Sequence, residues 1–99
     1  MITGKFFHTF LWDELAGWNV QWQGRVGDYN PEDNVALVLL FSWWDGSPTG
    51  QRLTKVSEDW VFYDTDVEMT AAYIAMLPAS DQEYAEKMNA LLRKEAVAL

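Results

Sequence analysis

Cysteine is absent from the 99-residue sequence. Its absence excludes disulfide bonds, thiolate nucleophiles and zinc sites built from thiolates. A chain of this length has room for one domain with one core, which packing alone must hold together. A lack of cysteine also suits a reducing compartment, so we expect a cytoplasmic protein.

Long apolar runs are missing too. No apolar stretch approaches the roughly 20 residues that a membrane-spanning helix needs. Residues 1–10 have no apolar core followed by a small-residue cleavage site, so no signal peptide is visible. We therefore expect a soluble protein that makes no membrane contact.

Catalytic signatures are scarce. His8 is the only histidine; it lies in a predicted strand, where a histidine is more often a hydrogen-bonded structural residue than a general base. The sequence contains no GxSxG, GxGxxG or GxxxxGK[ST] motif. Three acids, Asp64, Asp66 and Glu68, are close in sequence but lack the glycine of a calcium loop. We predict a non-enzymatic protein without catalytic residues, cofactor or metal.

Basic residues are few. Seven Lys and Arg stand against fifteen Asp and Glu, which gives a net charge of −8. Such a chain repels nucleic-acid phosphates and anionic membranes. We therefore predict a protein partner that is basic or binds nucleic acid, and no direct binding to nucleic acid. Solubility is the competing explanation, since small domains commonly carry a net charge of ~2–8.

What the sequence does contain is organised around an apolar run, Val35–Phe41, closed by turn residues at 45–50. Its length and its β-branched and aromatic residues predict a strand, from Val35 to about Trp43, that is buried on both faces. Flanking segments add four further predicted strands, at Gly4–Leu11, Trp18–Val26, Gln51–Ser57 and Trp60–Tyr63.

Apolar and polar residues alternate along Trp18–Val26, which predicts a strand with one face on the core. The core-facing set would be Trp18, Val20, Trp22, Gly24 and Val26. Gly24 indicates a bend or bulge where the sheet curves, and residues 27–33 are expected to form an acidic, turn-rich connection. Five short antiparallel strands then predict a small Src-homology-3-like barrel or rolled sheet.

Helical patterns begin at residue 64. Thr65 and Glu68 fit a capping box for a helix that Pro78 would stop after Leu77. Ser80, three residues before a glutamate, fits a second capping box for a last helix from about residue 81. The sequence thus predicts an α+β domain, in which a helical pair over 64–99 packs on a small β-barrel over 1–63.

The first of these helices is uncharged over Met69–Leu77, so it should be buried or covered all round. Val67, Ala71 and Ile74 are expected to face the sheet. Met69, Tyr73 and Met76 are expected to face the last helix or a second subunit. A structural homodimer through Met69–Leu77 is therefore one hypothesis for the chain.

Six tryptophans are many for a small core. Trp43 and Trp44 are adjacent in an extended segment and should point to opposite faces, so one is exposed beside Asp45 unless both faces are covered. An exposed tryptophan rimmed by acids suits a cationic partner. The candidate partner-binding residues are Trp43, Trp44, Asp45, Trp60, Tyr63, Glu58, Asp59, Asp13 and Glu14, the last two following Trp12. Alternatively, these tryptophans fill the barrel ends and the helix interface.

Four segments carry a family resemblance: GKFFH at 4–8, WQGRV at 22–26, LLFSWWDGSPTGQRL at 39–53 and WVFYD at 60–64. In them the chain resembles small uncharacterised proteins carried by phages and mobile elements, over about the first two-thirds of its length. The resemblance implies a mobile-element accessory protein, a class with many inhibitors of host defence, including anti-CRISPR proteins. It implies no activity and no catalytic residues.

The sequence thus predicts a protein–protein interaction module that binds a host protein. An alternative is an acidic inhibitor, of anti-CRISPR or anti-restriction type, that occupies a nucleic-acid-binding surface of its target. The acids proposed for that role are Asp13, Glu14, Asp28, Glu32, Asp33, Asp45, Glu58 and Asp59.

Overall fold

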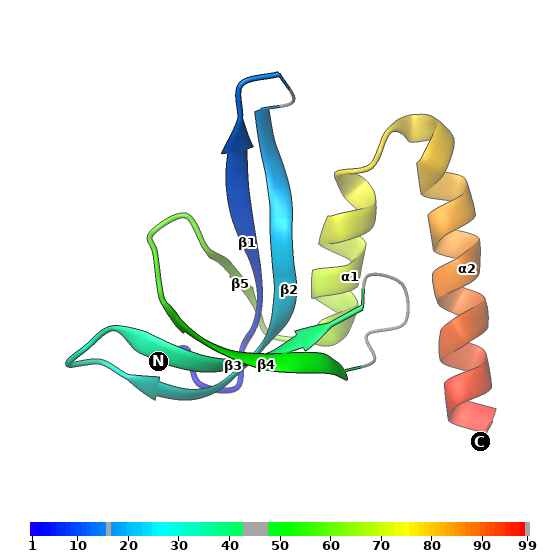
Figure 1. Cartoon of the computed structure of the whole chain (residues 1–99). Coiled ribbons are helices and arrows are strands. Elements are labelled where there is room, and N and C mark those ends of the chain that lie inside the picture. The colour runs from blue at the N-terminus through cyan, green and yellow to red at the C-terminus, as the bar shows by residue number, and fades with distance from the viewer. Residues whose placement is uncertain (16, 43–47, 99) are drawn as a thin grey trace.

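The computed structural model describes residues 1–15, 17–42 and 48–98. The chain forms β1 (Phe6–Asp13), β2 (Gly17–Asn30), β3 (Val35–Phe41), β4 (Pro48–Lys55), β5 (Val61–Tyr63), α1 (Asp66–Ala75) and α2 (Ala79–Ala98). The strands make one antiparallel sheet in the order β4-β3-β2-β1-β5, followed by the two helices (Figure 1). The predicted α+β class is confirmed. The sheet is not closed into a barrel, because β4 and β5 remain separate edges.

The strand β2 is longer than expected. It continues through Gly27–Asn30, which the sequence predicted as part of a connection, and it pairs with β1 along one stretch and with β3 along another. The β2–β3 register shifts between Val26 and Asp28, which makes Gly27 a bulge. Because bulges bend a strand and increase its twist, β3 and β4 run across the direction of β1 in Figure 1.

A hydrophobic core cluster lies on one face of the sheet, which we call the Phe7 face, and the helices bury Met69, Ile74 and Ala85 separately. Phe7, Val26, Ala36 and Val38 have no solvent exposure. Around them pack Ile2, Tyr29, Leu40, Val56, Trp60 and Phe62. These side chains come from the strands, the N-terminal segment and the β4–β5 connection, so the curved sheet covers this core without a helix.

The opposite face, the His8 face, is covered only in part. The helix α1 packs on β1 and β5, and the outward residues of β3 on this side, such as Leu37 and Leu39, remain half-exposed. The expectation that β3 is buried on both faces was therefore wrong, although the predicted start of this strand at Val35 was right. A helix of ten residues is too short to cover all five strands.

The start of α1 follows the capping prediction, since the Glu68 amide donates to Thr65 Oγ1 at 3.1 Å. The start of α2 does not. This helix begins at Ala79, and the carbonyl of Pro78 accepts from the amides of Asp81 and Gln82. The predicted cap, Ser80, therefore lies inside the first turn.

The predicted facing of α1 is reversed. The Tyr73 ring lies 6.4 Å from the His8 ring, so this side of α1 faces the sheet. Val67, Ala71 and Ile74 instead line a groove against α2. The side chain of Gln82 on α2 joins the two helices by donating to the carbonyl of Leu77 at 2.9 Å.

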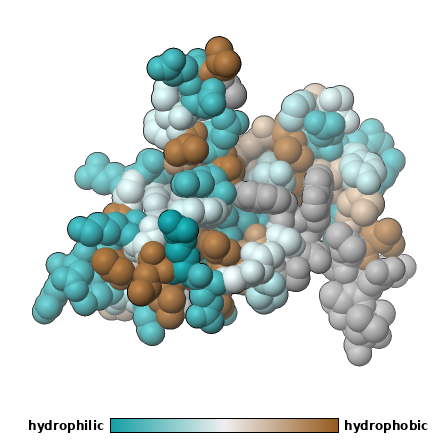
Figure 2. All heavy atoms as spheres, in the orientation of Figure 1, coloured by the Kyte–Doolittle hydropathy of each residue, from teal (hydrophilic) through white to brown (hydrophobic). Residues whose placement is uncertain are grey.

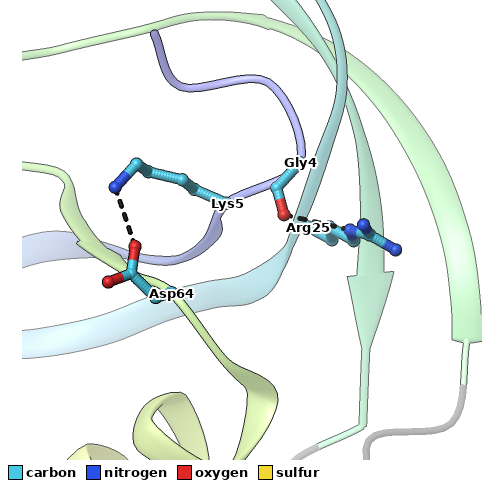
Figure 3. A network of polar contacts seen from close by, with 4 residues as sticks. All are labelled: Gly4, Lys5, Arg25 and Asp64. Atoms are coloured by element: carbon cyan, nitrogen blue, oxygen red, sulfur yellow. Dashed lines mark hydrogen bonds and ion pairs between the residues drawn. The ribbon is translucent and has the colours of Figure 1, made fainter.

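Two polar contacts hold the N-terminal segment (Figure 3). Arg25 Nε donates to the Gly4 carbonyl at 3.0 Å, and Lys5 Nζ pairs with Asp64 Oδ1 at 2.9 Å. The Lys5–Asp64 pair links the start of β1 to the approach to α1. It is exposed on both sides, so its contribution to stability is small.

Gly24 supplies a test of this architecture. A Cβ built at Gly24 would lie 1.9 Å from the Leu39 carbonyl oxygen, whereas one at Gly50 meets nothing within 4 Å. We expect Gly24→Ala to lower the free energy of unfolding by about 1–3 kcal/mol or more, because β2 and β3 must separate. Gly50→Ala, the matched control, should stay within about 0.5 kcal/mol. Urea denaturation measures both, and equal effects would contradict this packing.

Candidate partner-binding site

Part of the β1–β2 pair extends beyond the rest of the sheet. β5 pairs with β1 only over Phe6–His8, and β3 pairs with β2 only from Gly24 onward. Residues 9–13 and 17–23 therefore form a two-stranded extension, the β1–β2 ribbon, seen at the top of Figure 1. An isolated two-stranded ribbon is marginally stable in water, so this one needs side-chain contacts of its own.

A bulge in β2 changes which face the ribbon side chains occupy. Thr9 pairs with Trp22, but the next residue of β1, Phe10, pairs with Val20, so Gln21 is the extra residue. An inserted residue turns the following side chains to the opposite face. Trp22 thus lies on the Phe7 face, while Val20 and Trp18 lie on the His8 face. The prediction that all three share one face was wrong.

Trp12 and Trp18 form a cross-strand pair at the ribbon end. They are directly opposite in the register, with ring centroids 5.3 Å apart and an interplanar angle of 64°. Such edge-to-face pairs stabilise a hairpin. Even so, Trp12 is 57 % exposed and Trp18 is 60 % exposed. The pair therefore supports the ribbon and still presents most of its surface to solvent.

The turn beside this pair combines apolar and acidic groups. Leu15 in the turn is wholly exposed. Leu11 on β1, more than half exposed, lies on the opposite face of the ribbon from Trp12. Asp13 and Glu14 are exposed as well, and Asp13 Oδ1 accepts from the Leu15 amide at 2.7 Å, which shapes the turn. Figure 2 shows hydrophobic and hydrophilic atoms side by side at this end of the molecule.

A groove adjoins the ribbon where α1 ends. Its lining residues are Trp18, Asn19, Val20, Tyr73, Met76 and Leu77. Because α1 ends at Ala75, the side chain of Met76 is left 47 % exposed beside the ribbon. None of the lining residues carries a charge. The groove extends the exposed tryptophan surface along the His8 face to the end of α1.

The other predicted site residues do not join this surface. Trp60 is half-buried on the Phe7 face, stacked on Phe7 at 4.8 Å and 15°. Tyr63 is half-buried on the opposite face, where it contacts His8. These two aromatics therefore belong to different sides of the sheet. Residues 43–45, which include both adjacent tryptophans and Asp45, lie outside the described residues.

The candidate acids are found in three segments, two of which adjoin, because Asn34 Nδ2 beside the β2–β3 hairpin donates to the Val56 carbonyl in the β4–β5 connection at 2.7 Å. Asp13 and Glu14 lie at the ribbon end, Asp28, Glu32 and Asp33 on or beside the β2–β3 hairpin, and Glu58 and Asp59 in the β4–β5 connection. All seven are exposed. In Figure 1 the two hairpin ends point in different directions. The described acids therefore do not make one continuous row.

His8 lies at the centre of a buried polar network. Its ring has no solvent exposure, its Nδ1 lies 2.8 Å from the Tyr63 hydroxyl and its Nε2 lies 2.9 Å from Gln23 Oε1. Gln23 Nε2 in turn donates to the Ser42 carbonyl at 2.7 Å. Because a carbonyl only accepts, the amide orientation is fixed, so His8 donates from Nε2 and accepts the Tyr63 proton at Nδ1.

This arrangement favours the neutral imidazole. Burial lowers the pKa of His8, partly offset by the hydrogen bond to Gln23, and burial raises the pKa of Tyr63. Protein groups occupy both ring nitrogens. Within the described residues, no three histidine, cysteine, aspartate or glutamate side chains are grouped to hold a metal. No helix in the described part of the chain has the length and apolarity to span a membrane.

Comparisons with protein-family models, curated proteins and solved structures found no match. The resemblance to phage and mobile-element proteins stays a prediction. The function of the chain has to be inferred from its own geometry.

Sequence reasoning noted Trp12 beside its acids but placed Trp18 in the core and missed the α1 side of the groove. One signal for the pair was present. Trp12 and Trp18 are equally distant from Leu15, so a hairpin turning there places them opposite each other. No comparable signal marks Tyr73 and Met76, because their place beside the ribbon depends on how α1 packs.

The His8 network predicts a pH dependence. The unfolded histidine titrates near its ordinary pKa of 6.5, and the folded pKa is lower. Between these values only the unfolded chain binds the proton, so stability rises with pH. The stabilisation from neutral His8 is therefore complete above pH 6.5 and is lost as pH falls through the folded pKa. Urea denaturation below pH 6.5 should show this loss of stability. An NMR titration in which the His8 ring has its midpoint at or above pH 6.5 would contradict the prediction.

Proposed function

We propose that this chain is a protein-binding module that contacts its partner through the end of the β1–β2 ribbon. The observation that carries the proposal is the Trp12–Trp18 pair, which projects beyond the sheet with more than half of each side chain in water. Tryptophan is the residue type most enriched at energetic centres of protein interfaces. Clustered exposed apolar groups are also typical of interaction sites.

A purely structural role explains this surface less well. The cross-strand pair does stabilise the ribbon. The ribbon end, however, contributes none of the four fully buried residues of the core cluster, Phe7, Val26, Ala36 and Val38. Leu15, wholly exposed in the turn, instead adds apolar surface beside the tryptophans.

The distribution of acids favours this proposal over an inhibitor that imitates nucleic acid. An imitation of a phosphate backbone needs regularly spaced charges on one surface. The described acids instead lie in two separate regions, the ribbon end and the adjoining β2–β3 hairpin and β4–β5 connection. The acids at the ribbon end are the ones placed beside an exposed aromatic pair.

Site-specific photocrosslinking in cells that carry this chain tests the proposal. A photoreactive phenylalanine analogue replaces Leu15 at the ribbon end, or Leu53, which is 70 % exposed on β4, as the control. We expect a crosslinked protein at position 15 and none at position 53. Trp18→Ala in the position-15 variant should remove at least about nine-tenths of that product, because loss of an interface tryptophan commonly costs 2 kcal/mol or more.

A matched folding control accompanies this test. The melting temperature and the NMR spectrum of the core should remain those of a folded chain in the Trp18→Ala variant, since the core cluster does not include Trp18. A product at position 53 alone, or a product at position 15 that survives the Trp18 substitution, would contradict the proposal.

A further inference from the structure

The geometry points to an arginine-bearing segment of protein as the ligand of the ribbon end, and we propose that its guanidinium stacks on the Trp12–Trp18 pair. This inference rests on the proposed function, since it names the chemistry of the partner. It draws on three independent features: the arginine–aromatic contacts elsewhere in the fold, the charge near the Trp12–Trp18 pair, and the groove beside Trp18.

The fold already pairs arginines with aromatic rings. The Arg52 guanidinium lies 4.3 Å from the centroid of the Trp22 ring, and that of Arg25 lies 5.4 Å from the centroid of the Phe6 ring. Among the described residues, no such cation covers Trp12 or Trp18. Trp22, with an arginine over its ring, is half-buried, whereas the ribbon-end tryptophans are mostly exposed. An incoming guanidinium would give them the same contact.

The charge around the pair selects for a cation. Asp13 and Glu14 follow Trp12 directly, and residues 9–15 and 17–23 contain no lysine or arginine. The chain as a whole carries −8. A basic segment is therefore drawn to this end, while a nucleic acid or an acidic peptide is repelled.

The groove distinguishes arginine within a peptide from a free cation. Its side chains are uncharged, and Val20, Tyr73, Met76 and Leu77 give it apolar and aromatic walls next to Trp18. A peptide residue next to the arginine would place its apolar side chain in this groove.

Three capped peptides test the inference: one arginine between two leucines, and the same peptide with lysine or citrulline at the centre. Citrulline keeps the shape of arginine and removes its charge. Titrations are followed by the indole N–H resonances in proton–nitrogen NMR, assigned with Trp12→Phe and Trp18→Phe. The indole of Trp60, on the Phe7 face, is the internal control.

We expect the arginine peptide to shift the Trp12 and Trp18 indoles and leave that of Trp60 in place. The citrulline peptide should bind about five- to thirtyfold more weakly, the loss expected of a cation–π contact worth about 1–2 kcal/mol. The lysine peptide should fall between them. Asp13→Asn with Glu14→Gln should weaken arginine binding about threefold and reduce its salt dependence.

Equal binding of the arginine and citrulline peptides, or shifts no larger at the ribbon end than at Trp60, would overturn the inference. Failure of the proposed function looks different. If the proposed function is wrong, the Trp18-dependent crosslink at position 15 is absent, whatever the peptide titrations show. If the crosslink depends on Trp18 but the arginine and citrulline peptides bind equally, the proposed binding surface stands and arginine is rejected as its ligand.

Discussion

The backbone of β2 passes β3 so closely at Gly24 that a methyl group would overlap the Leu39 carbonyl. Because of this close approach, the long strand β2 forms part of the curved sheet on one side of Gly24 and part of the β1–β2 ribbon on the other. The core on the Phe7 face depends on the same approach, because Gly24 pairs with Phe7 on β1 and with Leu40 on β3. The projecting ribbon is thus anchored in the middle of the packed sheet.

The bulge at Gln21 determines which side chains lie on each face of the ribbon. Without the extra residue, Trp18 would share the Phe7 face with Trp22. With it, Trp18 lies on the side of α1, where the short helix ends and leaves Met76 beside it. Two local features, one inserted residue and one early helix end, therefore create a continuous apolar surface from separate parts of the chain.

The features that were predicted correctly from the sequence depend on neighbouring residues. The apolar run gave β3 its start at Val35, and the Thr65 cap gave α1 its start. The features that failed depend on distant pairing. The bulge at Gln21 exists only in relation to β1. The facing of α1 was reversed because a helix that is uncharged on all sides gives no direction in its pattern. Of the candidate site, Asp13 and Glu14 were predicted from the sequence, and the groove was not.

The hydrogen-bonded series from Tyr63 through His8 and Gln23 to Ser42 runs across the sheet, from β5 over β1 and β2 to the segment after β3. His8 and Gln23 each bond to two neighbours in the series. Sliding β1 against β2 by a single position would turn the side chains of His8 and Gln23 to opposite faces of the sheet and break their hydrogen bond. The series therefore fixes the alignment of these strands. It favours one mutual placement and disfavours the shifted ones that a flat, apolar sheet would tolerate.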